Sequence, residues 1–112
     1  MRTVTNLYNE GDTVFIRFEN EAIGKRFLQD AENEGFLING KKPPTKGSSN
    51  EIYMLDENFG IHPISGFVMH MFYYSGVEMN DGKSVVRINY GKYINGTDDY
   101  IIKGKPKPRV KD

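Results

Sequence analysis

The sequence predicts an α+β domain in which an antiparallel sheet of five to six strands packs against one main helix at about residues 21–34. Three observations predict this fold. Within residues 13–38 the hydrophobic period changes from two to between three and four, and then back to two. No other segment has a comparable helical period, and the turn-forming pairs Asp81-Gly82 and Asn95-Gly96 separate the apolar stretches near the C-terminus.

The first elements are two strands. Residues 4–7 favour a short strand, and Gly11-Asp12 favours a turn. Residues 13–18 then alternate in the manner of a half-buried strand, because Val14, Ile16 and Phe18 share one face.

The helix follows with clear start and stop signals. Asn20 is a favourable N-cap because its side-chain oxygen can accept a hydrogen bond from a free backbone amide. Gly35 suits the left-handed position after the last turn, and residues 36–38 return to a strand pattern. The apolar face consists of Ile23, Phe27, Leu28 and Ala31.

Residues 39–50, which we term the Lys-rich loop, contain two prolines, two glycines and three lysines. The next segment predicts a hairpin, with strands at 52–55 and 61–64 joined by a turn at 56–60. Pro63 restricts the second strand to a sheet edge or a bulge. Residues 66–74 fit a short helix or a buried strand, and their β-branched and aromatic content favours the strand. Two further strands are expected at 84–90 and 100–102.

Composition limits the function. The 112 residues predict a single domain at 1–102, followed by a basic, proline-containing flexible tail at 103–112. The chain has no cysteine, which excludes disulfides, zinc–thiolate centres and thiol nucleophiles. We expect no signal peptide and no membrane span, because the longest apolar run, 67–74, is short and contains His70. These observations predict a cytoplasmic protein.

Charge is zero overall but unevenly placed. The tail carries five basic residues and one acidic residue, a net +4, which leaves −4 on residues 1–102. A dedicated nucleic-acid-binding domain usually presents its positive charge on a folded face. A small accessory protein that binds nucleic acid through its basic tail is therefore the alternative rather than the main prediction.

Sequences that resemble catalytic or metal motifs do not meet the requirements of those motifs. The stretch 35–42 has the glycine spacing of a P-loop, but it follows a helix and has Lys42 where Ser or Thr is needed. Asp56, Asn58 and Gly60 do not match the spacing of a calcium loop. His62 and His70 are not spaced as metal ligands. We therefore predict no metal, no cofactor and no enzymatic activity.

The candidate ligand-binding residues are cations and aromatic rings. Lysine ammonium groups and free backbone amides of the Lys-rich loop are suited to a phosphate, although a solvated connection is the simpler interpretation of this composition. Tyrosines interleaved with cations can stack on bases or cover the sheet and contact proteins. His70 fits either a core position or a pocket. The predicted set is Lys41, Lys42, Lys46, His70, Tyr73, Arg87, Tyr90 and Tyr93.

The end of the helix contains acidic residues, where the helix dipole disfavours them. Asp30, Glu32 and Glu34 form either a solvated face relieved by neighbouring lysines or a contact patch for a basic partner.

Several short motifs resemble those of small proteins of bacteriophages and mobile elements of Gram-positive bacteria. They are Phe27-Leu28, Ala31-Glu32, Glu34-Gly35-Phe36, Lys42-Pro43, Thr45, Ile52, Leu55, His70-Met71, Arg87-Ile88-Asn89-Tyr90 and Lys92-Tyr93-Ile94. This resemblance implies a non-enzymatic protein in the cytoplasm of the bacterial host that antagonises a defence system by occupancy. The partner is either an immune effector protein, as for anti-CRISPR proteins, or a nucleotide immune signal. A homodimer would deepen the binding cleft of such a protein.

A small hydrolase that uses His62 or His70 is the third alternative function.

Overall fold

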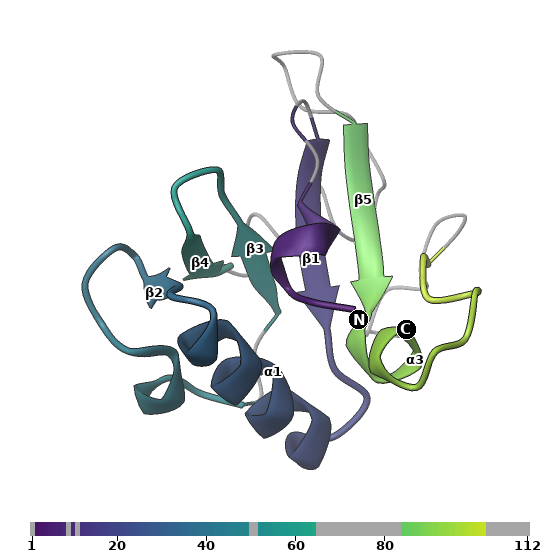
Figure 1. Cartoon of the computed structure of the whole chain (residues 1–112), viewed down its shortest axis with the longest axis horizontal. Coiled ribbons are helices and arrows are strands. Elements are labelled where there is room, and N and C mark those ends of the chain that lie inside the picture. Colours follow the sequence, from purple (N-terminus) through teal and green to yellow (C-terminus); the bar gives the residue numbers. More distant parts are fainter. Residues whose placement is uncertain (1, 9, 11, 50–51, 65–83, 103–112) are drawn as a thin grey trace, which may run out of the picture.

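The computed structural model describes residues 2–8, 10, 12–49, 52–64 and 84–102. It confirms an α+β domain with a five-stranded sheet and one main helix (Figure 1). The strands are β1 (Asp12–Arg17), β2 (Leu37–Ile38), β3 (Tyr53–Leu55), β4 (Gly60–Pro63) and β5 (Ser84–Asn89).

The sheet is mixed, so the predicted antiparallel sheet was wrong in part. The strand order is β2-β4-β3-β1-β5. β3 is antiparallel to both β1 and β4, whereas β1 pairs with β5, and β2 with β4, in parallel. The hydrophobic period shows which residues of a strand are buried, but it carries no information on the direction of the neighbouring strand. The number of strands falls within the predicted five to six.

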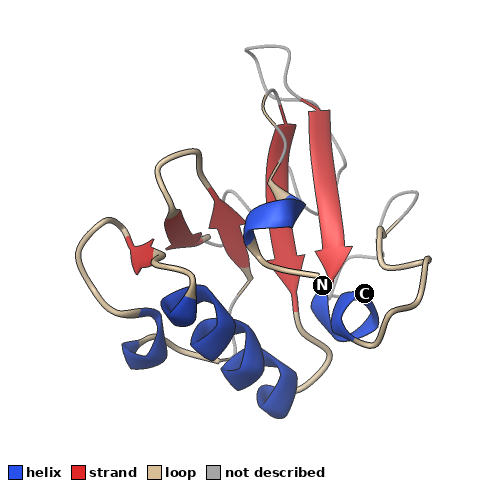
Figure 2. Ribbon diagram, viewed as in Figure 1, coloured by secondary structure: helices blue, strands red, loops and turns tan. Residues whose placement is uncertain are grey.

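Helix α1 (Glu21–Asn33) covers one face of the sheet and ends as its sequence predicts (Figures 1 and 2). The Asn20 side chain accepts a hydrogen bond from the backbone amide of Ile23 at 2.9 Å. Gly35 has φ +93°, and the amide of Phe36 bonds back to the Ala31 carbonyl at 2.9 Å. A residue that tolerates the left-handed conformation thus terminates the helix. The face buried in the core consists of Gly24, Phe27, Leu28 and Ala31.

The predicted hairpin at 51–65 forms through β3 and β4. Tyr53 pairs with Pro63, and Leu55 pairs with Ile61. β4 itself lies between β2 and β3, so the predicted edge position was wrong for this strand. Pro63 is tolerated because β2 pairs only with Gly60 and Ile61, and its missing N–H removes no hydrogen bond to β2.

The C-terminal part differs from the two strands expected at 84–90 and 100–102. The strand expected at 84–90 ends at Asn89, whose side chain caps helix α3 (Tyr90–Ile94) by accepting a hydrogen bond from the Lys92 amide at 3.2 Å. The expected strand at 100–102 is reduced to a single bridge between Ile88 and Ile101. A helical turn with its own cap therefore replaces the predicted strand-to-turn connection.

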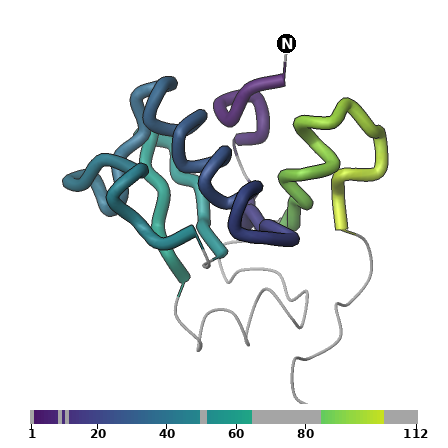
Figure 3. The backbone as a smooth tube through the Cα atoms, turned by 90° about the horizontal axis from the view of Figure 1, so that it is seen from below, coloured from purple at the N-terminus to yellow at the C-terminus, as the bar shows by residue number. Residues whose placement is uncertain are grey.

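The N-terminal strand expected at 4–7 is instead the 3-10 helix η1 (Thr5–Leu7), with Val4 and Leu7 buried in the core. Figure 3 shows this segment lying beside α1, so both elements cover the same side of the sheet. The expectations for 66–74, including the choice between strand and helix, and for the tail at 103–112 lie outside the described residues.

Candidate functional site

The Lys-rich loop begins directly after β2, at one edge of the sheet, and contains the 3-10 helix η2 (Pro44–Lys46). The backbone amide and hydroxyl of Thr45 both donate to one carboxylate oxygen of Glu32 on α1, at 3.1 and 2.6 Å. The hydroxyl of Tyr53 on β3 donates to the Ser48 carbonyl at 2.8 Å. The loop is therefore bonded to both the helix and the sheet.

Glycine allows the loop to approach α1 closely. A Cβ added to Gly24 would lie 2.3 Å from the carbonyl oxygen of Ser49. That distance is too short for any side chain larger than hydrogen, so Gly24 permits the helix and loop backbones to touch. The contact between loop and helix also stabilises the charged form of Glu32. The hydrogen bonds from Thr45, and less strongly the ammonium of Lys46, lower the pKa of this carboxyl group.

The three loop lysines, Lys41, Lys42 and Lys46, are exposed. Across the described residues, no carboxylate lies within ion-pair distance of any of them. In contrast, four basic side chains elsewhere form ion pairs: Arg2 with Asp98, Lys25 with Glu21, Arg26 with Asp30, and Lys92 with Asp99. The loop thus presents three cations that form no ion pair with the described part of the chain.

The backbone amides of the loop are largely used within the fold. The amides of Lys41 and Lys42 donate to the Ile38 carbonyl, and those of Lys46 and Gly47 donate to prolyl carbonyls. The phosphate cradle predicted from free amides therefore has few donors left, and ammonium groups are the main polar groups that remain for a ligand.

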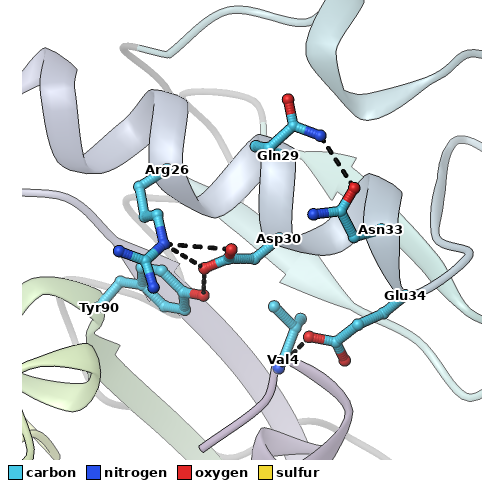
Figure 4. A network of polar contacts seen from close by, with 7 residues as sticks. All are labelled: Val4, Arg26, Gln29, Asp30, Asn33, Glu34 and Tyr90. Atoms are coloured by element: carbon cyan, nitrogen blue, oxygen red, sulfur yellow. Dashed lines mark hydrogen bonds and ion pairs between the residues drawn. The ribbon is translucent and has the colours of Figure 1, made fainter.

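Tyr90 and Tyr93, predicted as stacking residues, are 1% and 4% exposed. The Tyr90 hydroxyl donates to Asp30 at 2.6 Å (Figure 4), and the Tyr93 hydroxyl donates to the Thr3 carbonyl at 2.7 Å. Burial, reinforced by the Asp30 carboxylate, raises the pKa of Tyr90, and burial raises that of Tyr93. In this arrangement both rings pack in the core, and neither offers a face for stacking.

The remaining predicted residues do not join the loop. Arg87 lies on β5, is 6% exposed and directs its guanidinium to the Ile102 carbonyl at 3.4 Å. β2 and β5 are the two edges of the sheet, so four strand spacings, roughly 19 Å, separate them. His70 and Tyr73 lie outside the described residues, so their roles stay predictions. Of the predicted residues that the structure describes, Lys41, Lys42 and Lys46 alone share one segment.

The acidic end of α1 serves a role that the sequence analysis missed. Asp30 accepts hydrogen bonds from Arg26 and Tyr90, and Glu34 accepts one from the Val4 amide at the start of η1 (Figure 4). Glu32 accepts from Thr45 in the Lys-rich loop. Each carboxylate thus attaches a different segment to the helix. The only sequence signal was their position at the helix end that disfavours anions, which indicates that tertiary contacts compensate.

His62 lies between two side-chain oxygens. Its Nδ1 is 2.7 Å from Asn39 Oδ1, and its Nε2 bonds Asp56 Oδ2. The other Asp56 oxygen accepts hydrogen bonds from the amides of Asn58 and Gly60, both at 2.8 Å. Burial acts to raise the pKa of Asp56, but the hydrogen bonds from His62 and these amides outweigh it and lower the pKa. Among the contacts of the described residues, none joins His62 to a hydroxyl nucleophile.

The described segments lack two further features, a metal-binding cluster and a membrane-spanning helix. They contain no group of three or more His, Asp or Glu side chains placed to hold a metal ion. None of their helices combines the length and apolar character needed to cross a bilayer.

Comparison with known proteins gives no relative: no family model matches the chain, and neither curated proteins nor solved structures show significant similarity.

Proposed function

We propose that this chain is a non-enzymatic binding protein that antagonises a bacterial defence system by occupying an acidic surface of an effector protein with its Lys-rich loop. The observation that carries the proposal is the combination of three exposed lysines, which form no ion pair with the described residues, with a loop bonded to both α1 and β3. A contact surface that is already ordered loses less conformational entropy on binding than a mobile one. Unpaired charges on such a surface favour a partner of opposite charge.

An effector protein suits these residues better than a nucleotide signal. A nucleotide site needs stacking rings beside its cations, whereas Tyr90 and Tyr93 are buried and Arg87 lies on the opposite edge strand. The loop amides that would bind a phosphate already donate to carbonyls or to Glu32. The lysine side chains alone suit a broad acidic protein surface, where several point charges act together.

The defence context comes from the resemblance of the sequence to small phage and mobile-element proteins. The test is therefore biological. The chain is expressed in bacterial strains that each carry one defence system, and phage plating efficiency is measured. We expect plating to recover in at least one strain, and the Lys41→Glu, Lys42→Glu, Lys46→Glu triple variant to lose that recovery. Failure to recover in every strain would remove the defence role.

A single-residue comparison separates the loop from general charge. Lys42→Glu and Arg17→Glu make the same change in net charge at exposed positions, one in the loop and one at the end of β1. We expect only Lys42→Glu to weaken recovery, and equal effects of the two variants would contradict a role of the loop.

Two further experiments test the alternative ligands. Calorimetry with cyclic and ADP-ribose-derived nucleotides tests whether the chain binds a nucleotide signal. A gel-shift assay with a variant that lacks residues 103–112 tests whether the basic tail binds nucleic acid.

A further inference from the structure

A cavity of about 260 Å³ lies between η1, the start of β2 and the β3–β4 turn, and it shares no residue with the Lys-rich loop. Its lining is mostly aromatic and acidic, consisting of Thr5, Tyr8, Phe36, Asp56, Glu57 and Phe59. None of the described residues that line the cavity is basic. The cavity is therefore separate from the surface used in the proposed function.

Phe59 is the most exposed large apolar residue of the described chain, at 48%. It has φ +57°, a left-handed backbone conformation that is unusual for a bulky residue. Its ring meets that of Phe36 edge-on, with centroids 5.2 Å apart. The turn thus holds an aromatic ring at the mouth of the cavity although burial of that ring is incomplete.

The charges around the cavity are mainly negative. Both oxygens of Asp56 are engaged, one by His62 and the other by backbone amides. The Glu34 carboxylate bonds Thr5 on the far side of the lining. Glu57 forms no hydrogen bond or ion pair with any described residue, so its charge remains available to a partner.

We propose that this cavity binds an arginine side chain presented by a partner protein. A guanidinium stacks on aromatic faces and donates to carboxylates, so it matches a lining that contains both. The aliphatic stem of arginine can pack along the rings of Phe36 and Phe59 while the charged end reaches Glu57. The cavity supplies the apolar contact, and its acidic rim selects the cation.

The test uses the full chain and three capped tripeptides, acetyl-Ala-X-Ala-amide, in which X is arginine, citrulline or norleucine. Citrulline keeps the shape and length of arginine but lacks its charge. Binding is followed by NMR shifts of the backbone amides of Thr5, Tyr8, Phe36 and Glu57. We expect the arginine peptide to bind about fivefold more tightly than the citrulline peptide, the size of one exposed charge-assisted contact.

Three variants locate the contact. Glu57→Gln should remove the advantage of arginine over citrulline, and Phe59→Asn should weaken all three peptides. Asn tolerates the positive φ of position 59, so this variant retains the turn. Leu37→Asn is the matched control, because it removes another exposed apolar side chain. No shifts at millimolar arginine peptide, equal binding of citrulline, or an equal effect of Leu37→Asn would each overturn the proposal.

Discussion

The carboxylate of Glu34 accepts hydrogen bonds from both the backbone amide and the hydroxyl of Thr5, at 2.8 and 2.6 Å. Its second oxygen accepts the amide of Val4, also at 2.8 Å. A residue at the end of α1 thus caps the first amides of η1, whose N-cap residue Val4 makes no side-chain hydrogen bond. This contact attaches the N-terminal segment to the helix.

Glu34→Ala should lower the free energy of unfolding by about 1–2 kcal/mol, because three donors lose a charged acceptor at a half-buried position. Urea denaturation measures the change. Glu21→Ala, at the exposed start of α1, is the control and should cost less. If the two variants lose equal stability, the carboxylate of Glu34 does not hold η1.

Gly24→Ala should destabilise the protein although alanine favours a helix by about 1 kcal/mol relative to glycine. The new Cβ would contact the Ser49 carbonyl at 2.3 Å and displace the Lys-rich loop. Thermal unfolding and proteolysis of the loop measure the two effects. A higher melting temperature with an unchanged loop would show that the helix and loop do not touch at this position.

Phe27→Ala should cost about 3–5 kcal/mol, the range for removal of a buried aromatic ring. Phe27 is fully buried, and its ring meets those of Phe18, Tyr53 and Tyr90 at centroid distances of 5.1 to 6.0 Å. Denaturation by urea tests this, with the half-exposed Leu37→Ala as the control. A loss below about 1 kcal/mol would contradict the assignment of this helix face to the core.

Tyr90 should make the fold sensitive to alkali. Its pKa is raised in the folded protein, so its contribution is complete below the unfolded value of about 10 and is lost as pH rises further. Above about pH 10, where Tyr90 ionises in the unfolded chain but not in the folded one, this residue should lower the free energy of unfolding by about 1.4 kcal/mol per pH unit.

Tyr90→Phe should lower stability at neutral pH by about 1–2 kcal/mol, through loss of the bond to Asp30, and should also reduce the alkaline slope. Urea denaturation at a series of pH values from neutral to strongly alkaline measures both effects. An unchanged slope in the variant would mean that Tyr90 ionises as easily in the folded chain as in the unfolded one.

Asp56 should make the fold sensitive to acid. Because its folded pKa is lowered, its contribution is present above the unfolded value of about 3.9 and is lost as pH falls through the folded value. Asp56→Asn should therefore flatten the dependence of stability on pH below about pH 4. Acid titration of the unfolding transition compares this variant with the unmodified chain, and an equally steep loss of stability in both would contradict the role of Asp56.

Local sequence patterns predict most elements of this fold but not their arrangement in the sheet. The cap at Asn20, the stop at Gly35 and the hairpin of β3 and β4 depend on local contacts, and all three are present. The directions of β2 and β5 depend on where the chain returns to the sheet after a long connection. No local pattern reports that path, so the parallel pairs were missed.

The candidate site likewise has one part that the local sequence predicts and one part that only packing decides. Composition alone indicated that the Lys-rich loop carries exposed cations, because lysines beside Pro, Gly and Ser favour solvent. Tyr90 and Tyr93 resembled a stacking surface in sequence, but α3 turns them into the core. The sequence alone does not show whether a tyrosine ring lies in the core or at the surface. Only the packing of the tertiary structure decides this.

By itself, the sequence determined the α+β class, the boundaries of α1 and the cationic character of the Lys-rich loop, because capping, period and solvation act between residues close in the chain. Only the tertiary structure decided the strand order, the burial of the tyrosines and the partners of Asp30, Glu32 and Glu34. Those depend on contacts between distant segments, whose energies are set by the packing of the whole domain.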